Sequence, residues 1–298
     1  MFSGTLTAMI TPFHGDAVDY ECLDRQIAAQ IDAGVDGLVP VGTTGESPTL
    51  SHEEHRAVVE RVCTQAAGRA KVVAGTGSNA TAEAVSLTRH ARQVGADAAL
   101  VVNPYYNKPT QEGLFRHFME VADVGLPIVL YNIPGRTAVA LSAETIGRLA
   151  QHENIVAVKE ATGSMDMASE IAAVCDLDRF AILSGDDSLT LPLMALGGHG
   201  VISVASNLLP QRVKALTDAA SAGDFAQAAR LHHALFPLFK AMFVETNPIP
   251  IKAAMELAGR DSGQLRLPMC EISAANRRRL VAALEAAGVL RGAVGQPH

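Results

Sequence analysis

Residues 34–46, with the sequence G-V-D-G-L-V-P-V-G-T-T-G-E, run from a Gly-x-Asp turn through a short apolar stretch into a glycine-rich polar loop. The same order returns at residues 95–106, G-A-D-A-A-L-V-V-N-P-Y-Y. A buried strand that ends in a polar loop is typical of a β-α unit, and the two segments are separated by two units of about 30 residues each. The pattern therefore predicts a chain built from repeated β-α units.

Short apolar runs of this kind alternate with helical patterns from near the N-terminus to about residue 222. Eight are present, at residues 6–10, 37–41, 71–74, 98–102, 128–131, 155–159, 180–183 and 201–204. Eight strands that alternate with helices over about 220 residues predict a closed (β/α)₈ TIM barrel of the α/β class, in preference to an open doubly wound sheet.

The pattern changes after Gly223, where no further strand is expected. Three helical patterns follow, at residues 224–243, 247–258 and 273–287. We therefore expect two parts: a barrel with the active site over residues 1–223, and a C-terminal three-helix region over residues 224–298. The end of that region, after Leu290, is rich in glycine, proline and polar residues and is expected to be frayed.

Composition and charge exclude several classes of protein. The chain has 298 residues, 48% of them hydrophobic, and a formal net charge of −7, which excludes a disordered chain and argues against binding to nucleic acid. Residues 188–211 carry no Asp, Glu, Lys or Arg, but glycines, prolines and polar side chains interrupt them. We expect this stretch to form buried elements and no membrane span.

Two further features favour the cytoplasm. Acidic residues precede the first basic residue, Arg25, so we expect no secretory signal. The four cysteines contain no C-x-x-C pair and are expected to be reduced, packed thiols: Cys22, Cys63, Cys175 and Cys270.

Three local motifs resemble cofactor or metal sites but fit them poorly. His52 and His55 are three residues apart, whereas a zincin helix needs a spacing of four, so we expect no metal there. Residues 75–80 resemble a dinucleotide fingerprint, but Asp97 precedes its strand instead of following it, so no nicotinamide cofactor is expected. Residues 185–187 (G-D-D) could offer oxygen ligands to a cation or cap a helix, and the sequence leaves both open.

In a TIM barrel the chemistry lies on the loops after the strands, and Lys159 ends a predicted strand. Period-two alternation places it on the same side as Ile155 and Ala157. If that side is the lumen, lost hydration favours the neutral amine, which can attack a ketone to form a Schiff base. The alternative is a lysine at the rim that pairs with Glu160 or another carboxylate.

Other polar side chains follow the same predicted edge. Tyr131 could pass a proton or simply pack, and Thr43 and Thr44 lie in a loop that could bind a carboxylate or be an ordinary turn. Arg136 could grip a second carboxylate or form a surface ion pair. Tyr105 and Tyr106, half of the four tyrosines, share one loop.

Five segments in register closely resemble the family of 4-hydroxy-tetrahydrodipicolinate (dihydrodipicolinate) synthases, within the N-acetylneuraminate lyase superfamily of pyruvate-dependent class I aldolases. They are G-T-T-G-E at 42–46, P-Y-Y at 104–106, Y-N-I-P-G-R-T at 131–137, V-K-E-A-T at 158–162 and G-G-H-G-V-I-S-V at 197–204. The resemblance runs from Met1 to about Leu290 and includes N-P-I-P-I-K at 247–252.

The resemblance implies a lyase that condenses pyruvate with L-aspartate 4-semialdehyde in the diaminopimelate and lysine pathway, without a cofactor. Lys159 would form the Schiff base, and a proton relay would consist of Tyr131, Thr43 and Tyr106. Tyr106 would reach into the neighbouring subunit of a homotetramer built as a dimer of dimers. The substrates would be bound by Thr44 at the pyruvate carboxylate, Arg136 at the semialdehyde carboxylate, and the main chain of Gly185 and Ile202.

Feedback inhibition by L-lysine is a second trait of this family. By similarity, the effector site would consist of Ser47, Pro48, His52, His55, Asn79, Glu83 and Tyr105. Pro48 departs from the alanine often found there and removes a backbone donor, so sensitivity to lysine is a hypothesis for this chain.

Two other functions stay open at this point. N-acetylneuraminate lyases and 2-keto-3-deoxy sugar acid aldolases share the lysine and the tyrosine, although Arg136 and the paired tyrosines at 105–106 favour the synthase. A non-catalytic barrel that binds a keto acid would keep Thr43, Thr44 and Arg136 but has no need of Lys159.

Overall fold

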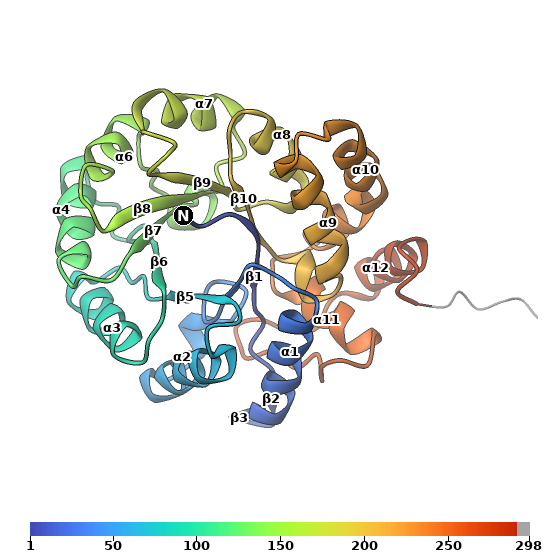
Figure 1. The fold of residues 1–298 in the computed structure, drawn as a ribbon. Coiled ribbons are helices and arrows are strands. Elements are labelled where there is room, and N and C mark those ends of the chain that lie inside the picture. Colours follow the sequence, from blue (N-terminus) through green and yellow to red (C-terminus); the bar gives the residue numbers. More distant parts are fainter. Residues whose placement is uncertain (291–298) are drawn as a thin grey trace, which may run out of the picture.

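The computed structural model describes residues 1–290 and confirms the predicted TIM barrel (Figure 1). Eight parallel strands close in the order β1-β10-β9-β8-β7-β6-β5-β4. They are β1 (Gly4–Ala8), β4 (Gly37–Val39), β5 (Lys71–Gly75), β6 (Ala98–Val102), β7 (Ile128–Asn132), β8 (Ile155–Glu160), β9 (Ala181–Ser184) and β10 (Gly200–Ser203). Each one lies within two residues of a predicted apolar run.

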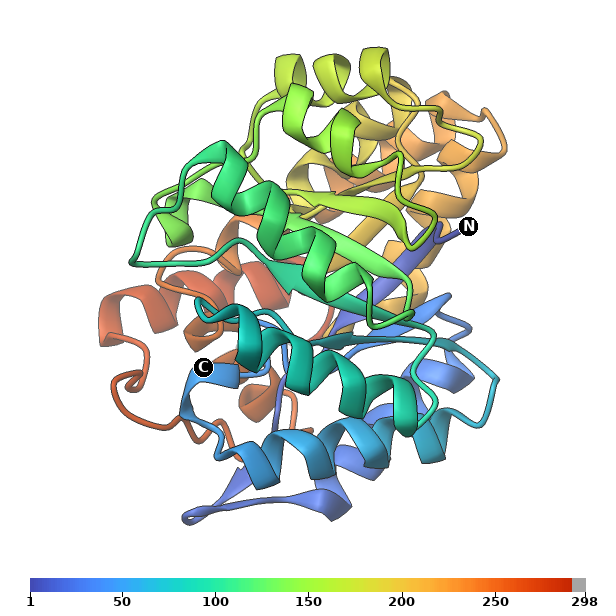
Figure 2. The same cartoon turned by 90° about the vertical axis from the view of Figure 1, so that its left-hand side faces the viewer.

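Helices form a ring around these strands (Figure 1), and Figure 2 shows the helices of one side covering the barrel. They are α1 (Tyr20–Asp32), α2 (His52–Ala66), α3 (Thr81–Gln93), α4 (Gln111–Ala122), α6 (Ala143–Leu149), α7 (Met165–Val174), α8 (Thr190–Ala195) and α9 (Pro210–Ser221). Short helical turns lie in the loops after four strands: η1 (Ser47–Thr49), α5 (Pro134–Thr137), η2 (Asp187–Leu189) and η3 (Ala205–Asn207).

The strands separate two apolar layers, one in the lumen and one beneath the helices. Alternate residues point into each layer, so the lumen is filled by side chains such as Leu100, Val129 and Ala157. The prediction that Ile155 shares the side of Lys159 is wrong, because Ile155 packs in the outer layer. The pairing of β7 with β8 shifts by one residue after Ile155, which reverses the alternation at this point.

The N-terminal part contains one element that the sequence pattern did not reveal. Strands β2 (Phe13–His14) and β3 (Ala17–Val18) form a small antiparallel hairpin before α1. All four cysteines are free thiols, as expected. Cys270 is exposed, contrary to the prediction that all four are packed, because it lies in the irregular segment before the last helix.

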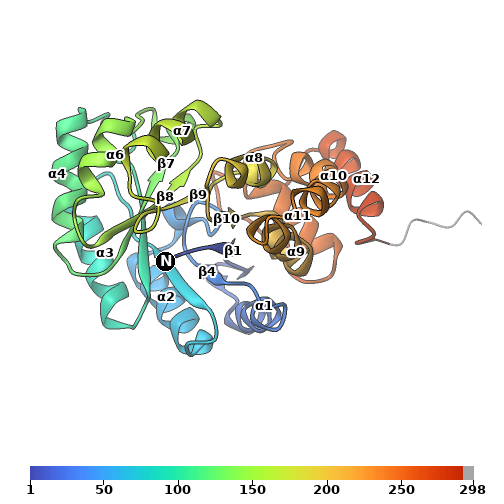
Figure 3. The ribbon, with the colours of Figure 1, turned by 45° about the horizontal axis from the view of Figure 1, so that its top comes forward.

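The three predicted C-terminal helices are present as α10 (Phe225–Ala241), α11 (Ile249–Leu257) and α12 (Ala274–Ala286). Figure 3 shows them gathered on one side of the barrel, beside α8 and α9. Their apolar side chains share one core with Val201 and Val204 at β10. The division at Gly223 stays a prediction, and the expected fraying after Leu290 lies outside the described residues. Among residues 1–290, no helix combines the length and the apolar composition that a membrane crossing requires.

Candidate active site

Lys159 lies at the carboxyl end of β8 and points into the barrel. Its residue is only 5% exposed, and its Nζ atom lies 4.2 Å from the centroid of the Tyr131 ring. Tyr131 is the residue opposite Lys159 in the β7-β8 pairing, and Ala157, two residues earlier on β8, packs in the lumen. The carboxyl end of the strands is the part of a TIM barrel where catalytic side chains lie.

The alternative reading, an ion pair at the rim, is not what the structure shows. The buried Glu160 carboxylate accepts hydrogen bonds from Asn132 Nδ2 at 3.1 Å and from the backbone N–H of Thr162 at 2.6 Å. Burial raises the pKa of Glu160 above its ordinary value. Within residues 1–290, Lys159 makes no salt bridge and its Nζ atom makes no hydrogen bond. The Glu160 carboxylate therefore links the end of β7 to the end of β8, and it does not pair with Lys159.

Gly185 and Ile202 lie at neighbouring strand ends. A Cβ atom on Gly185 would lie 2.6 Å from the Cβ of Ala161 and 3.2 Å from the Cε of Lys159, so any side chain here would press on the lysine stem. Ile202 is fully buried in the lumen. The adjacent Asp186 accepts the backbone N–H of Ser188 and caps η2, which supports the capping interpretation of residues 185–187.

The loop after β4 presents Thr43 and Thr44. The backbone N–H groups of Gly45 and Glu46 close turns inside the loop. Those of Thr43 and Thr44 make no hydrogen bond to another part of the described chain, so they are free to bind a ligand. The turn interpretation is therefore correct for the second half of the loop, while the first half keeps the groups that a carboxylate needs.

Arg136 lies on α5, the short helix after β7. It is exposed and forms no salt bridge within the described residues. Its Nη2 atom donates a hydrogen bond of 3.0 Å to the backbone oxygen of Asn247. Asn247 in turn donates a hydrogen bond from its side-chain Nδ2 to Thr44 Oγ1, also at 3.0 Å. The surface ion pair considered above is absent from this part of the chain, and the guanidinium keeps donors for a ligand.

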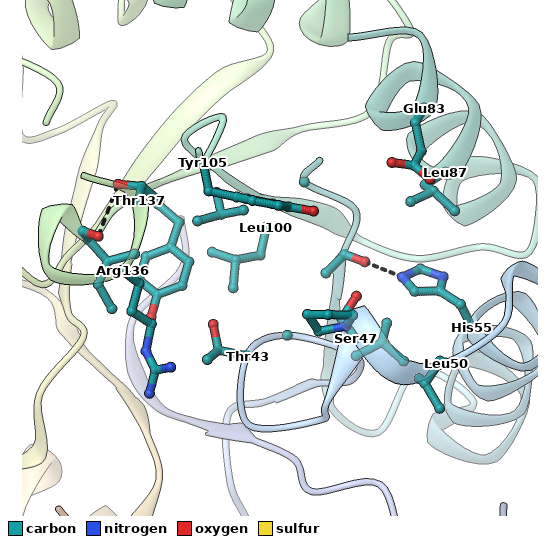
Figure 4. Close-up of a pocket in the computed structure, with 18 of the residues that line it drawn as sticks. Thr43, Ser47, Leu50, His55, Glu83, Leu87, Leu100, Tyr105, Arg136 and Thr137 are labelled. Atoms are coloured by element: carbon teal, nitrogen blue, oxygen red, sulfur yellow. Dashed lines mark hydrogen bonds between the residues drawn. The ribbon is translucent and has the colours of Figure 1, made fainter. Parts of the chain in front are cut away.

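A cavity of about 370 Å³ joins these loops. Its lining includes Thr43, Tyr131 and Arg136. In the view of Figure 4, His55 and Glu83 lie on the opposite side from Thr43 and Arg136, with the Tyr105 side chain between. Lys159 is not a lining residue, and neither are Thr44, Gly185 and Ile202; the Nζ atom of Lys159 lies 4.2 Å from the centroid of the Tyr131 ring, which does line the cavity. The volume, and the few polar groups set in a mainly apolar lining, suit a small carboxylic acid.

Six of the seven predicted effector residues line the same cavity: Ser47, Pro48, His52, His55, Glu83 and Tyr105. His52 Nε2 lies 2.6 Å from a carboxylate oxygen of Glu83, which also accepts the hydroxyl of Ser78. Asn79 is not in the lining, and its backbone oxygen accepts a hydrogen bond from Asn107.

His55 is held differently from His52. Its Nε2 atom contacts the backbone oxygen of Gly75 at 2.9 Å, and burial lowers its pKa to about 4. The ring is therefore neutral at pH 7, with Nε2 as the donor to Gly75 and Nδ1 as a buried acceptor that has no partner among residues 1–290.

Tyr106 lies apart from the other candidates within one chain. It is 90% exposed and adopts a φ of +75°, which is uncommon for a residue with a side chain. Lys108 in the same loop has a φ of +46°, and Asn107 ties the loop to the backbone of Asn79 at 2.8 Å. The surrounding contacts thus hold an exposed phenol in a defined, strained position.

Sequence reasoning missed two polar residues of the C-terminal region that contact the loop after β4, Asn247 and Lys252. Lys252 is fully buried on α11, and its Nζ atom donates to Glu46 Oε1 and to Thr11 O, each at 2.8 Å. Burial lowers the pKa of Lys252, and the Glu46 carboxylate opposes this shift. The signal in the sequence was a lysine between Ile251 and Ala253, where a buried cation requires a partner.

The sequence is similar to known proteins over almost its whole length. The model of the dihydrodipicolinate synthetase family matches residues 1–287. The 4-hydroxy-tetrahydrodipicolinate synthase of Citrifermentans bemidjiense is 53% identical over 286 residues, which cover 96% of this chain and 98% of that protein.

Solved structures agree with this relationship. The crystal structure of dihydrodipicolinate synthase from Aquifex aeolicus superimposes with a TM-score of 0.95 at 53% identity and covers 97% of this chain and 99% of that one. The enzyme from Cyanidioschyzon merolae, crystallised with lysine bound, gives a TM-score of 0.94 at 42% identity, with 97% and 99% of the two chains covered.

Proposed function

This chain belongs to the dihydrodipicolinate synthetase family and condenses pyruvate with L-aspartate 4-semialdehyde on the route to diaminopimelate and lysine, and we propose that Lys159 carries this reaction. The observation that supports the assignment is an amino group buried at the carboxyl end of the barrel beside Tyr131, without a carboxylate partner in residues 1–290. The other buried lysine, Lys252, forms a salt bridge with Glu46.

In the proposed mechanism, the Lys159 amine attacks the ketone carbon of pyruvate, and loss of water leaves a protonated imine. The imine withdraws electrons, so the methyl group loses a proton and becomes an enamine carbon nucleophile. That carbon attacks the aldehyde carbon of the second substrate, whose oxygen takes up a proton. The amine of the second substrate then displaces Lys159 from the imine carbon, which closes the ring and frees the enzyme.

We assign the proton transfers to Tyr131, Thr43 and Tyr106. Tyr131 contacts the Lys159 amine, and Thr43 lines the same cavity. Thr44 would hold the pyruvate carboxylate and Arg136 the carboxylate of the semialdehyde, while the backbone of Gly185 and Ile202 would form the floor of the pocket. The two free N–H groups of the loop after β4 support a carboxylate at that position.

Tyr106 is expected to act in the site of a neighbouring subunit, since it is exposed at the tip of a strained loop. Tyr106→Phe removes only the hydroxyl, so we expect turnover to fall by about 100-fold, the scale of one proton-transfer group, with little change in stability. Steady-state rates and thermal unfolding measure both effects. Rates equal to those of the wild type would remove Tyr106 from the relay.

A coupled assay tests the substrate assignment. Turnover with pyruvate and L-aspartate 4-semialdehyde is expected, whereas cleavage of N-acetylneuraminate or of a 2-keto-3-deoxy sugar acid would support the aldolase alternative. The position of Arg136 at the cavity, without a salt bridge in the described chain, supports a second carboxylic acid substrate.

We further propose that L-lysine binds in the cavity beyond Tyr105, as it binds the Cyanidioschyzon merolae enzyme. Glu83 would pair with an ammonium group, displacing His52, and Ser47, Pro48 and His55, which also line the cavity, would complete the site. Titration of lysine into the pyruvate-loaded enzyme should release heat, and Glu83→Gln should abolish it because the ion pair is lost. No heat from the wild type would refute sensitivity to lysine.

We propose a homotetramer, built as a dimer of dimers, which would bring Tyr106 to a second active site; light scattering would measure its mass. We also propose the cytoplasm as the compartment, as the unpaired cysteines suggest.

A further inference from the structure

Asn247 connects the two carboxylate-binding side chains of the proposed site. Its side chain is buried, with 5% of the residue exposed, and lies just before α11. The side-chain amide reaches Thr44, and the backbone oxygen holds Arg136, each at 3.0 Å. These two residues come from different barrel loops, so Asn247 is the point at which the C-terminal region meets both.

We infer that Asn247 is a positioning residue that orients the Thr44 hydroxyl toward the pyruvate carboxylate and holds Arg136 through its backbone; this inference rests on the proposed function. The direction of the hydrogen bond carries the argument. Because the Asn247 amide donates to Thr44 Oγ1, it occupies a lone pair of that oxygen. The hydroxyl proton makes no hydrogen bond within the described residues and can be donated to a substrate oxygen. A hydroxyl that accepts a hydrogen bond from an amide is also a stronger hydrogen-bond donor than one that accepts none.

The segment that carries Asn247 is fixed at its other end. Lys252, five residues later, forms the buried ion pair with Glu46 in the loop that contains Thr44. The ion pair of Lys252 with Glu46 and the hydrogen bond of Asn247 to Thr44 attach the same loop at two points. Together they hold the Asn247 amide beside the Thr44 hydroxyl. The side-chain Oδ1 of Asn247 is buried without a partner in residues 1–290, so the contact with Thr44 is the one hydrogen bond that this side chain makes in the described chain.

Two substitutions distinguish a role of Asn247 in orienting the Thr44 hydroxyl from a role in holding the loop alone. Asn247→Ala removes one neutral hydrogen bond, and we expect the KM for pyruvate to rise by about 2- to 12-fold. Asn247→Asp places a carboxylate beside Thr44. That carboxylate would accept a hydrogen bond from the Thr44 hydroxyl and would repel the substrate carboxylate, so the increase should exceed that of the alanine variant. The KM for the semialdehyde should stay within about twofold in both variants, since Arg136 is held by the backbone.

The matched control is Asn276→Ala in α12, where the side chain bonds Glu245 at 2.8 Å away from the site. It should change neither KM. In a Thr44→Val background, Asn247→Ala should raise the KM for pyruvate no further, because the hydroxyl is already absent. Equal increases in both KM values, or an aspartate variant no worse than the alanine variant, would overturn the inference.

Reductive trapping keeps this test separate from the proposed function. With pyruvate and borohydride, Asn247→Ala should still be modified at Lys159, but half-maximal modification should need more pyruvate than in the wild type. Unchanged half-maximal concentrations would refute the role of Asn247 alone, whereas absence of modification in the wild type would refute the assignment of Lys159.

Discussion

Lys159→Met is expected to lower turnover by about a thousandfold or more, the scale seen when a covalent nucleophile is removed, without weakening the fold. Methionine retains an unbranched apolar stem beside Gly185, and its side chain is one heavy atom shorter than that of lysine. The amino group has no hydrogen bond to lose in residues 1–290, and the variant gives up only its contact with the face of the Tyr131 ring. Its free energy of unfolding should therefore lie within about 1 kcal/mol of the wild-type value.

Initial rates and urea unfolding measure the two halves of this prediction. Lys240→Met, an exposed lysine on α10, is the control for the substitution itself and should leave both unchanged. Turnover of Lys159→Met within tenfold of the wild type would exclude a covalent role for this lysine.

Unlike Lys159→Met, Lys252→Met should destabilise the protein, by about 3–5 kcal/mol, because it leaves the buried Glu46 carboxylate without its cation. The Glu46 side chain is 2% exposed, and its remaining partner is the backbone N–H of Arg266 at 3.1 Å. The Thr11 oxygen loses its donor, and the Phe13 ring loses a cation 4.2 Å from its centroid.

Urea unfolding of two variants tests this claim. Adding Glu46→Gln to Lys252→Met removes the unpaired charge, so the double variant should recover part of the lost stability. A loss below about 1 kcal/mol for Lys252→Met, or no recovery in the double variant, would show that the pair contributes little to the attachment of the C-terminal region.

Sequence patterns predicted the barrel because each strand is a short apolar run followed by a polar loop, a signal contained within a few residues. The hairpin of β2 and β3 escaped because two-residue strands have no periodicity to detect. Alternation failed at Ile155 because it assumes an unbroken register, and the shift in the β7-β8 pairing is set by a neighbouring strand.

Site residues, too, could be predicted from the sequence only where the signal lies within a few residues. Lys159 could be predicted from its place at a strand end, whereas the roles of Tyr106 and the effector residues rested on family resemblance. Asn247 and Lys252 were missed because their partners, Thr44 and Glu46, lie more than 200 residues away along the chain. Only the closed fold brings them together, and no local pattern records such a contact.

The most direct test of the central claim is to treat the wild type with pyruvate and sodium borohydride and to map the modified peptide by mass spectrometry. The chain has six lysines, and the account predicts one 1-carboxyethyl group, on Lys159, that is absent from Lys159→Met. A stable adduct on Lys252 or any other lysine, with Lys159 unmodified, would contradict it.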